Sequence, residues 1–186
     1  MLDEQRFGAD ETPCLSVRHL SKRFGAGCPH CLGPGAQLNR NVCPRCGTVH
    51  AVRDVSLEVF PGEIVGVVGE SGSGKSTFMK CLFFDEEATE GEVRALPYDG
   101  GAANLLELSP QQRRAVRNTV FGMVYQNPYL GLRMDFSSLS NIAEQMIAAG
   151  SRSVGAMRGR GEELLSRVNI PLTRAAEPPR NFSGGM

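Results

Sequence analysis

The spacing of apolar residues changes along this 186-residue chain, from every second residue near the start to every third or fourth near the end. Apolar and polar residues alternate over residues 15–24 and 55–60, which predicts two half-buried β-strands. A continuous apolar run, Ile64–Val68, follows the Pro61-Gly62 turn and predicts a buried strand. The first part of the chain is therefore expected to contain a β-sheet.

The middle of the chain predicts shorter elements. We expect a helix over residues 75–83, a short strand over 92–96 and a second apolar strand over 119–125. Ser109-Pro110-Gln111-Gln112 has the residues of a capping box, with Ser at the cap and Gln at the third helical position, and so opens a further helix.

Helical spacing dominates the last part of the chain. Apolar residues between Leu139 and Ile147 recur at i, i+3, i+4, i+7 and i+8, with Ser138 as the expected cap and Gly150 as the stop. A second helix is expected up to Val168.

A glycine-rich loop joins the predicted strand 64–68 to the helix that begins at Lys75. Its sequence fits the G-x-x-x-x-G-K-[ST] pattern of a phosphate-binding loop in the required strand-to-helix context. Without Cβ atoms at its glycines, the backbone can curl and direct successive N–H groups at a polyphosphate, and the helix dipole adds positive charge. Lys75 is then expected between the β- and γ-phosphates, with the Ser76 hydroxyl on Mg²⁺. The predicted nucleotide-binding residues of this loop are Gly69, Gly72, Ser73, Gly74, Lys75, Ser76 and Thr77.

An ordinary glycine-rich turn is the structural alternative. It agrees less well with the sequence, because the loop, the lysine, the hydroxyl and the flanking elements all fit phosphate binding.

Charge and composition narrow the classes of partner. The chain has 20 Lys and Arg against 20 Asp and Glu, which argues against a nucleic-acid binder that works by bulk charge. No apolar run reaches the roughly 18 residues needed to span a bilayer, and the acidic N-terminus does not fit a secretory signal. We expect a cytoplasmic protein of one domain with a small insertion, which reaches the inner membrane only through a partner.

Four of the six cysteines form two C-x-x-C pairs in the Gly- and Pro-rich segment 25–50. The pairs are Cys28-Pro29-His30-Cys31 and, eleven residues later, Cys43-Pro44-Arg45-Cys46. Such pairs form tight turns that direct both thiolates at one ion, and four sulfurs suit tetrahedral Zn²⁺. An iron centre, or redox or disulfide cysteines, are the alternatives.

His30 and His50 could each replace a cysteine ligand, whereas Cys14 and Cys81 are expected to be small core residues. A bound metal would close a long loop that has almost no core of its own, so its role is expected to be structural. A docking surface for a partner is the alternative role.

Four motifs follow one another in a recognisable order. They are Phe24 at the end of the first strand, the loop 69–77, Gln126 after the predicted strand 119–125, and Phe182-Ser183-Gly184-Gly185-Met186. In this order the sequence resembles the nucleotide-binding domain of ABC-type ATPases over nearly the whole chain apart from the insertion. Taken one at a time, each motif is weak evidence for this family. Phe24 alone would be an ordinary strand-end aromatic, Gln126 a solvated loop residue and Ser-Gly-Gly a flexible turn.

The resemblance implies roles for these residues. In that family the aromatic matching Phe24 stacks on adenine, and the glutamine matching Gln126 reaches the Mg²⁺ and the attacking water, a catalytic role. Ser183, Gly184 and Gly185 match the signature sequence, which contacts ATP held by the opposite subunit of a head-to-tail dimer.

The resemblance also implies a fold. We expect an α/β P-loop NTPase of the ABC type, present in part, whose antiparallel β subdomain over residues 1–60 is interrupted by a small zinc-knuckle insertion at 25–50. A P-loop core over 61–130 and an α-helical subdomain over 131–186 should follow.

Within the family, short matches favour the ATP-binding subunit of the carbon–phosphorus lyase system for phosphonate breakdown. They are residues 125–133, Asn141-Ile142-Ala143-Glu144, Asn169-Ile170-Pro171 and the signature that starts with Phe and ends with Met. The alternative is the ATPase of an oligopeptide-type importer, which has a similar Asp/Asn-Pro-Tyr after the glutamine. The expected partners are therefore a second ATPase subunit and either a lyase core complex or a membrane permease.

One departure from the family pattern bears on catalysis. The sequence ends at Met186, inside the signature, whereas the family continues to a strand with the Mg²⁺-linked Asp and the catalytic Glu. We expect a fragment of a longer product that binds nucleotide at most weakly, does not turn over ATP and exposes the apolar faces of its central strands.

Two classes of function follow. The first is an ATP-driven subunit that dimerises over two ATP molecules and moves a partner. The second is a non-enzymatic module whose zinc cluster binds another protein, the phosphate loop being incidental; the neutral charge disfavours nucleic acid as its ligand.

Overall fold

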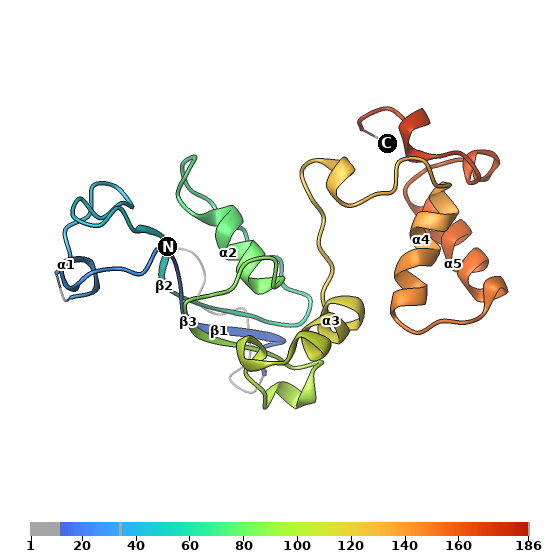
Figure 1. The fold of residues 1–186 in the computed structure, drawn as a ribbon. Helices are drawn as coiled ribbons and strands as arrows, with labels where there is room; N and C mark the ends of the chain where they lie inside the picture. The colour runs from blue at the N-terminus through green and yellow to red at the C-terminus, as the bar shows by residue number, and fades with distance from the viewer. Residues whose placement is uncertain (1–11, 34, 186) are drawn as a thin grey trace, which may run out of the picture. The chain divides into compact units, whose positions relative to one another are not determined.

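A computed structural model describes residues 12–33 and 35–185 (Figure 1). The acidic N-terminus and Met186, the last residue of the signature, lie outside the described residues. The chain divides into two compact units, Met1–Arg114 and Ala115–Met186, and each is described by itself.

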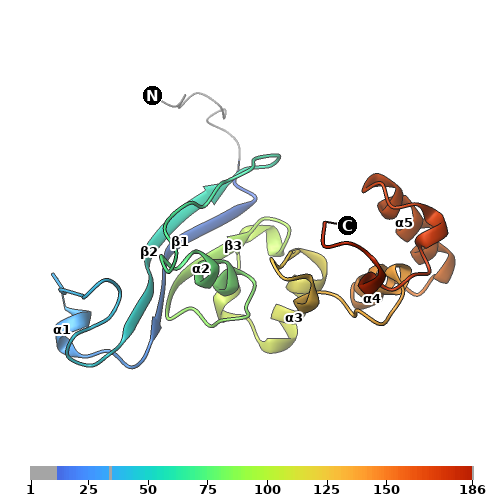
Figure 2. The same cartoon turned by 90° about the horizontal axis from the view of Figure 1, so that it is seen from above.

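The first unit contains a three-stranded antiparallel sheet of order β2-β1-β3 (Figure 2). Its strands are β1 (Leu15–Phe24), β2 (Val49–Val59) and β3 (Glu90–Ala95). These strands confirm the β structure predicted from the alternating pattern, and β2 begins earlier in the chain than the alternation indicates. Between β1 and β2 lies the insertion, which contains the short helix α1 (Pro29–Leu32).

The sheet buries one apolar face. Val17 and Leu20 of β1 lie opposite Leu57 and Val55 of β2 and are almost fully buried. The register shifts between Val17 and Leu20, so two apolar residues three positions apart both point into the core.

Two helices of the first unit were predicted from the sequence. They are α2 (Lys75–Leu82) and α3 (Pro110–Thr119), which runs past Arg114. The capping box is present, because the Ser109 N–H donates to Gln112 Oε1 at 3.0 Å and the Gln112 N–H to Ser109 Oγ at 3.4 Å. The single-turn helices η1 (Asp99–Gly101) and η2 (Leu105–Glu107) lie between β3 and α3.

The predicted core cysteines differ in burial. Cys81 on α2 is fully buried, whereas Cys14 is half-buried and its thiol donates to the Val59 carbonyl at 3.1 Å.

The predicted strands over residues 64–68 and 119–125 are wrong for the structure as described. Neither segment is a strand: Thr119 is the last residue of α3, and Ile64, Val68 and Val124 expose more than nine-tenths of their surface. A β-strand needs a neighbouring strand to satisfy its N–H and C=O groups, and no described segment pairs with either one. The apolar side chains of segment 64–68 are exposed, as expected, whereas in segment 119–125 Val124 is exposed and the other apolar side chains are half-buried.

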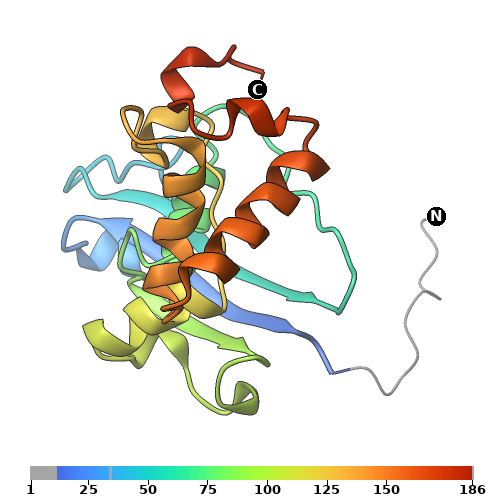
Figure 3. The ribbon, with the colours of Figure 1, turned by 90° about the vertical axis from the view of Figure 1, so that its right-hand side faces the viewer.

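The second unit is helical. Its main helices are α4 (Ser138–Ala148) and α5 (Val154–Arg167), which lie side by side (Figures 1 and 3). Gly161 of α5 is buried at their contact, where a Cβ atom would lie 2.6 Å from Leu139 Cδ2. Single turns η3 (Pro128–Leu130), η4 (Leu172–Arg174) and η5 (Pro179–Asn181) complete the unit.

The predicted cap of α4 is wrong by one residue. Ser137 is the N-cap, and its Oγ accepts the Ser140 N–H at 3.1 Å. Ser138 is buried and its hydroxyl instead donates to the Glu177 carbonyl at 3.0 Å.

Candidate functional site

A cavity of about 290 Å³ in the first unit brings together residues that are distant in the sequence. Its wall is formed by the glycine-rich loop, the start of α2, the end of β1, the start of β2 and one residue of the insertion. The lining residues are Phe24, Asn41, Val49, Ala51, Gly72, Ser73, Gly74, Lys75, Ser76 and Thr77. Seven predicted site residues therefore face one space, and Gly69 lies next to it through its contact with Lys75.

The loop packs closely against β2 at Gly74. This residue has a φ of 93°, and a Cβ atom built on it would lie only 1.9 Å from the Ala51 carbonyl oxygen. Gly74 is also the N-cap of α2 and accepts the Phe78 N–H at 2.8 Å. Only glycine satisfies both the backbone angle and the close approach.

Lys75 turns back over the loop that precedes it. Its Nζ donates to the carbonyls of Gly69 and Glu70, both at 2.7 Å, and lies 3.3 Å from Ser73 Oγ. The ammonium group therefore occupies the centre of the loop, where its positive charge is exposed to the cavity.

The start of α2 adds further positive potential. Lys75, Ser76 and Thr77 form its first turn, whose N–H groups have no carbonyl partner within the helix. These groups and the helix dipole favour an anion at this point of the cavity.

Phe24 lies on another wall of the cavity, at the end of β1. Its ring is partly exposed, and Lys22 Nζ lies 4.6 Å from the ring centroid. Lys22 is itself held by the Glu87 carbonyl at 2.8 Å and by Glu86 at 3.5 Å. The ring is thus an apolar surface supported by a fixed cation.

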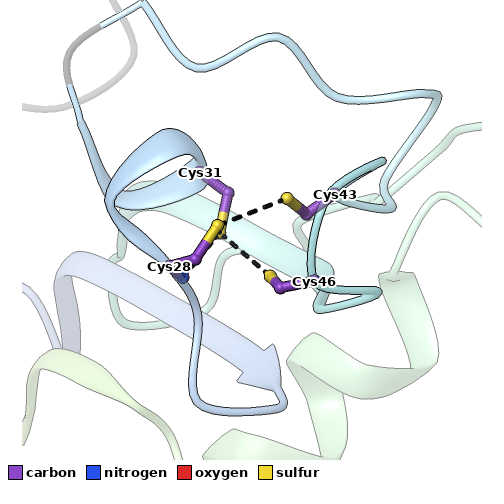
Figure 4. A group of neighbouring side chains, drawn as sticks. All are labelled: Cys28, Cys31, Cys43 and Cys46. Atoms are coloured by element: carbon purple, nitrogen blue, oxygen red, sulfur yellow. Dashed lines mark hydrogen bonds between the residues drawn. The ribbon is translucent and has the colours of Figure 1, made fainter.

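The four cysteines of the insertion form one cluster (Figure 4). Cys28 and Cys31 come from the turn of α1, Cys43 and Cys46 from a second turn, and their sulfurs all lie within 4.8 Å of one another. Three sulfur pairs, Cys28–Cys31, Cys28–Cys43 and Cys31–Cys46, are 3.7 to 3.8 Å apart.

These distances fit a tetrahedral metal. Four sulfurs at the usual Zn–S length of about 2.3 Å lie about 3.8 Å from one another. The observed sulfur–sulfur distances are far longer than the roughly 2.05 Å of a disulfide bond, and all six cysteines are free. Neither His30 nor His50 belongs to the cluster, which among the described residues consists of cysteines alone.

The pKa values of two thiols in the cluster are shifted in opposite directions. The Thr48 hydroxyl, 3.2 Å from Cys46 Sγ, lowers the pKa of that thiol to about 6. The pKa of Cys31 is lowered by the Cys28 backbone N–H, but burial and the neighbouring thiols outweigh this effect and raise it to about 11. Crowded thiolates repel one another, and a bound divalent cation would remove that cost.

The remaining predicted residues meet in the second unit. Gln126, Ser183, Gly184 and Gly185 line a cavity of about 560 Å³. Apolar side chains such as Tyr125, Met134 and Phe182 form much of the rest of its wall. Phe182 is held by Arg174, whose guanidinium carbon lies 4.2 Å from the ring centroid.

Sequence reasoning missed Asn41, Val49 and Ala51 in the first cavity. Asn41 Nδ2 donates to the Gly72 carbonyl of the glycine-rich loop at 3.2 Å. Its partner is 31 residues away, and no local motif marks an asparagine for such a contact.

None of the helices in the described residues is both long enough and apolar enough to cross a membrane.

Comparison with known proteins gives consistent matches. Residues 52–186 match the family described as ABC transporter. PhnK of Escherichia coli (strain K12), whose description is that of a phosphonates utilization ATP-binding protein, is 39% identical over 133 residues. That alignment covers 72% of this chain and 51% of PhnK.

The oligopeptide transport ATP-binding protein OppF of Bacillus subtilis (strain 168) is 35% identical over 172 residues. That alignment covers 92% of this chain and 49% of OppF. The chain thus spans about half the length of these two curated relatives.

Two solved structures share the fold. One is a dimeric, post-hydrolysis state of an ATP-binding cassette bound to ADP and Pi, and the other is a dimeric bacterial ABC transporter cassette. Each has a TM-score of 0.69 at 24% identity, and each match covers 92% of this chain and 64% of the solved chain.

Proposed function

The chain belongs to the ABC transporter family as an ATP-binding subunit, and from this premise we propose that it is the nucleotide-binding part of a subunit that couples the binding and hydrolysis of ATP with Mg²⁺ to a phosphonate carbon–phosphorus lyase complex. The observation that carries the nucleotide part is the cavity in which the glycine-rich loop, Lys75 and Phe24 meet. The similarity to PhnK supports the phosphonate part.

Within the cavity each residue has a role that its chemistry allows. The Lys75 ammonium group exchanges its carbonyl partners for β- and γ-phosphate oxygens, and the N–H groups of the loop and of the first turn of α2 bind the same phosphates. The Ser76 hydroxyl would hold Mg²⁺, and the apolar face of Phe24 would receive the adenine ring.

The second unit supplies the groups that act across a dimer. Ser183, Gly184 and Gly185 would contact ATP held by a second ATPase subunit in a head-to-tail pair, and Gln126 would lie where it can orient a water near the Mg²⁺. The similarity to dimeric cassettes supports this arrangement.

Nucleotide binding by the full chain tests the first step. Lys75→Ala should weaken the binding of a fluorescent ATP analogue with Mg²⁺ on the order of 100-fold, because a charged hydrogen-bond donor to the phosphates is lost. Lys80→Ala is the matched control, since Lys80 is an exposed lysine on the same helix outside the cavity. Equal binding by wild type and Lys75→Ala would contradict the assignment of the cavity.

A growth assay tests the coupling to phosphonate breakdown. Cells that lack their own phosphonates utilization ATPase are supplied with the complete gene that encodes this sequence and given a phosphonate as the sole phosphorus source. Growth should be restored by wild type and by Lys80→Ala but not by Lys75→Ala. Restored peptide uptake in cells lacking an oligopeptide importer ATPase would favour the alternative that the similarity to OppF suggests. Growth that survives Lys75→Ala would favour the non-enzymatic interaction module.

The four-cysteine cluster is proposed to hold one Zn²⁺. The sulfur distances support this assignment, since they match those of a tetrahedral ZnS₄ site. Metal analysis of the purified chain should find about one Zn²⁺ per molecule, lost in Cys43→Ser and retained in the control Cys14→Ser. A coloured iron centre in the wild type would overturn the choice of metal.

A further inference from the structure

We propose that the metal cluster and the nucleotide cavity are one coupled system, in which the insertion holds the glycine-rich loop through Asn41. A metal on the four cysteines then strengthens nucleotide binding, and a nucleotide strengthens metal binding. This inference rests on the proposed function of both sites.

The direct contact is the hydrogen bond from Asn41 Nδ2 to the Gly72 carbonyl at 3.2 Å. Gly72 lies in the middle of the loop and has a φ of 79°, a conformation that L side chains rarely adopt. A hydrogen bond to its carbonyl fixes the orientation of the adjoining peptide unit. The N–H groups that bind phosphate must be oriented before binding for the site to be tight.

Asn41 is itself fixed by the turn that carries the second pair of cysteines. Its carbonyl accepts the His50 N–H at 2.7 Å, and Val42 bridges to Val49 of β2. Two residues after Asn41, the Cys43 N–H donates to the Thr48 carbonyl at 2.8 Å. The position of Asn41 is therefore set by the same turn that presents Cys43 and Cys46 to a metal.

Thr48 connects this turn to the other wall of the cavity. The residue is almost fully buried, and its hydroxyl accepts the Gly27 N–H at 3.0 Å while lying 3.2 Å from Cys46 Sγ. Gly27 follows Phe24 closely in the chain, and Phe24 pairs with Val49 of β2. The exit of β1, where Phe24 lines the cavity, is thus also tied to the cluster.

The insertion depends on the cluster because it has little else to hold it together. Among its described residues from 25 to 48, only Cys31, Cys43 and Thr48 are buried. A segment without an apolar core gains its order from the ion that its ligands share. Loss of the metal therefore loosens the segment that carries Asn41.

Coupling of this kind is reciprocal. If a bound metal raises nucleotide affinity by some factor, a bound nucleotide raises metal affinity by the same factor. We expect a factor on the order of tenfold, within the usual range for coupled sites.

The experiment measures the affinity of a fluorescent ATP analogue for the full chain, Zn²⁺-loaded and Zn²⁺-free. The metal is removed with a chelator, the chelator is dialysed away and Mg²⁺ is added back, so that only Zn²⁺ differs between samples. Asn41→Ala is compared with Asn39→Ala, because Asn39 is an exposed asparagine of the same insertion that does not line the cavity. Circular dichroism checks that the sheet is retained in every sample.

Removal of Zn²⁺ should weaken nucleotide binding about tenfold in wild type and in Asn39→Ala. Asn41→Ala should bind nucleotide more weakly than wild type and should show a smaller effect of Zn²⁺, since the link through Asn41 is cut and only the connection at the exit of β1 remains. A competing zinc chelator should report tighter Zn²⁺ binding in the presence of the nucleotide analogue, by the same factor.

Nucleotide binding that is equal with and without Zn²⁺, or an Asn41→Ala chain that keeps the full metal effect, would overturn the inference while leaving the nucleotide site in place. Failure of the Zn²⁺-loaded wild type to bind the analogue at all would overturn both the inference and the proposed function.

Discussion

At the scale of single residues, Gly74 is the glycine of the cavity wall that leaves the least room for a side chain. Replacing it with alanine places a Cβ atom 1.9 Å from the Ala51 carbonyl oxygen and imposes a φ of 93° on a residue with a side chain. The left-handed conformation alone costs on the order of 1–3 kcal/mol, and the clash requires the loop to leave β2. Gly74→Ala should therefore abolish binding of an ATP analogue and lower the midpoint of urea unfolding.

Gly72→Ala separates the two causes of that effect. Gly72 also has a positive φ, 79°, but a Cβ atom there would meet nothing within 4 Å. Gly72→Ala should therefore be destabilised only by the unfavourable backbone angle and should keep measurable binding of the ATP analogue. If both variants lose binding equally, the packing of the loop against β2 is not what the nucleotide site requires.

His50 should make the stability of the chain depend on pH. It is buried, and within the described part of the chain its Nε2 has no hydrogen-bond partner. Burial, helped by Arg53 and Arg23, lowers the pKa of His50 below its ordinary value of 6.5. Since the unfolded chain then binds the proton more readily than the folded one, stability should fall as the pH drops from 6.5 toward the folded pKa.

Urea unfolding of wild type and His50→Gln at pH 7.5 and pH 5.5 measures this effect. Protonation of the cysteines contributes to both chains, so the part of the pH dependence missing from His50→Gln belongs to His50. An identical loss of stability in the two chains would contradict the assignment.

At the scale of elements, local patterns predicted the helices well, and their boundaries less well. The sequence predicts Ser138 as the cap of α4, and the helical period does not show that the neighbouring Ser137 is the cap instead. The Ser138 hydroxyl donates to the Glu177 carbonyl, 39 residues away, so Ser137 rather than Ser138 caps the helix. A choice made by a distant carbonyl cannot be read from neighbouring residues.

The cap gives a prediction for α4. Ser137→Ala should destabilise the second unit by about 1 kcal/mol, because the Ser140 N–H loses its acceptor. Ser137→Asp is the matched control, since aspartate accepts the same hydrogen bond and should keep the stability near that of wild type. Urea unfolding followed by helical circular dichroism measures both, and an unaffected Ser137→Ala chain would show that the cap contributes little.

At the scale of the whole molecule, most of the site residues predicted from the sequence belong to short motifs, whereas Phe24 was assigned only through the resemblance to the family. The loop from Gly69 to Thr77 and the two C-x-x-C pairs each carry their chemistry within a few residues. Asn41 joins the cavity through a contact across 31 residues, and the segments 64–68 and 119–125, which were predicted as strands, pair with no described segment. An apolar run predicts that a segment is suited to burial, whereas its partner is set by the rest of the fold.

The unpaired segment 64–68 gives the last prediction. Ile64 exposes 96% and Val68 92% of their surface, although burying such side chains is worth about 1.5–3 kcal/mol each. The chain should therefore bind an apolar fluorescent dye and associate with itself as its concentration rises. Changing both residues to threonine keeps the preference for strand structure while removing apolar surface, so dye fluorescence and the associated fraction in sedimentation should both fall. Val154→Thr is the control, because Val154 is a single exposed valine at the start of α5 and its loss should leave both signals unchanged. Equal dye binding by all three chains would mean that the segment 64–68 is covered in solution.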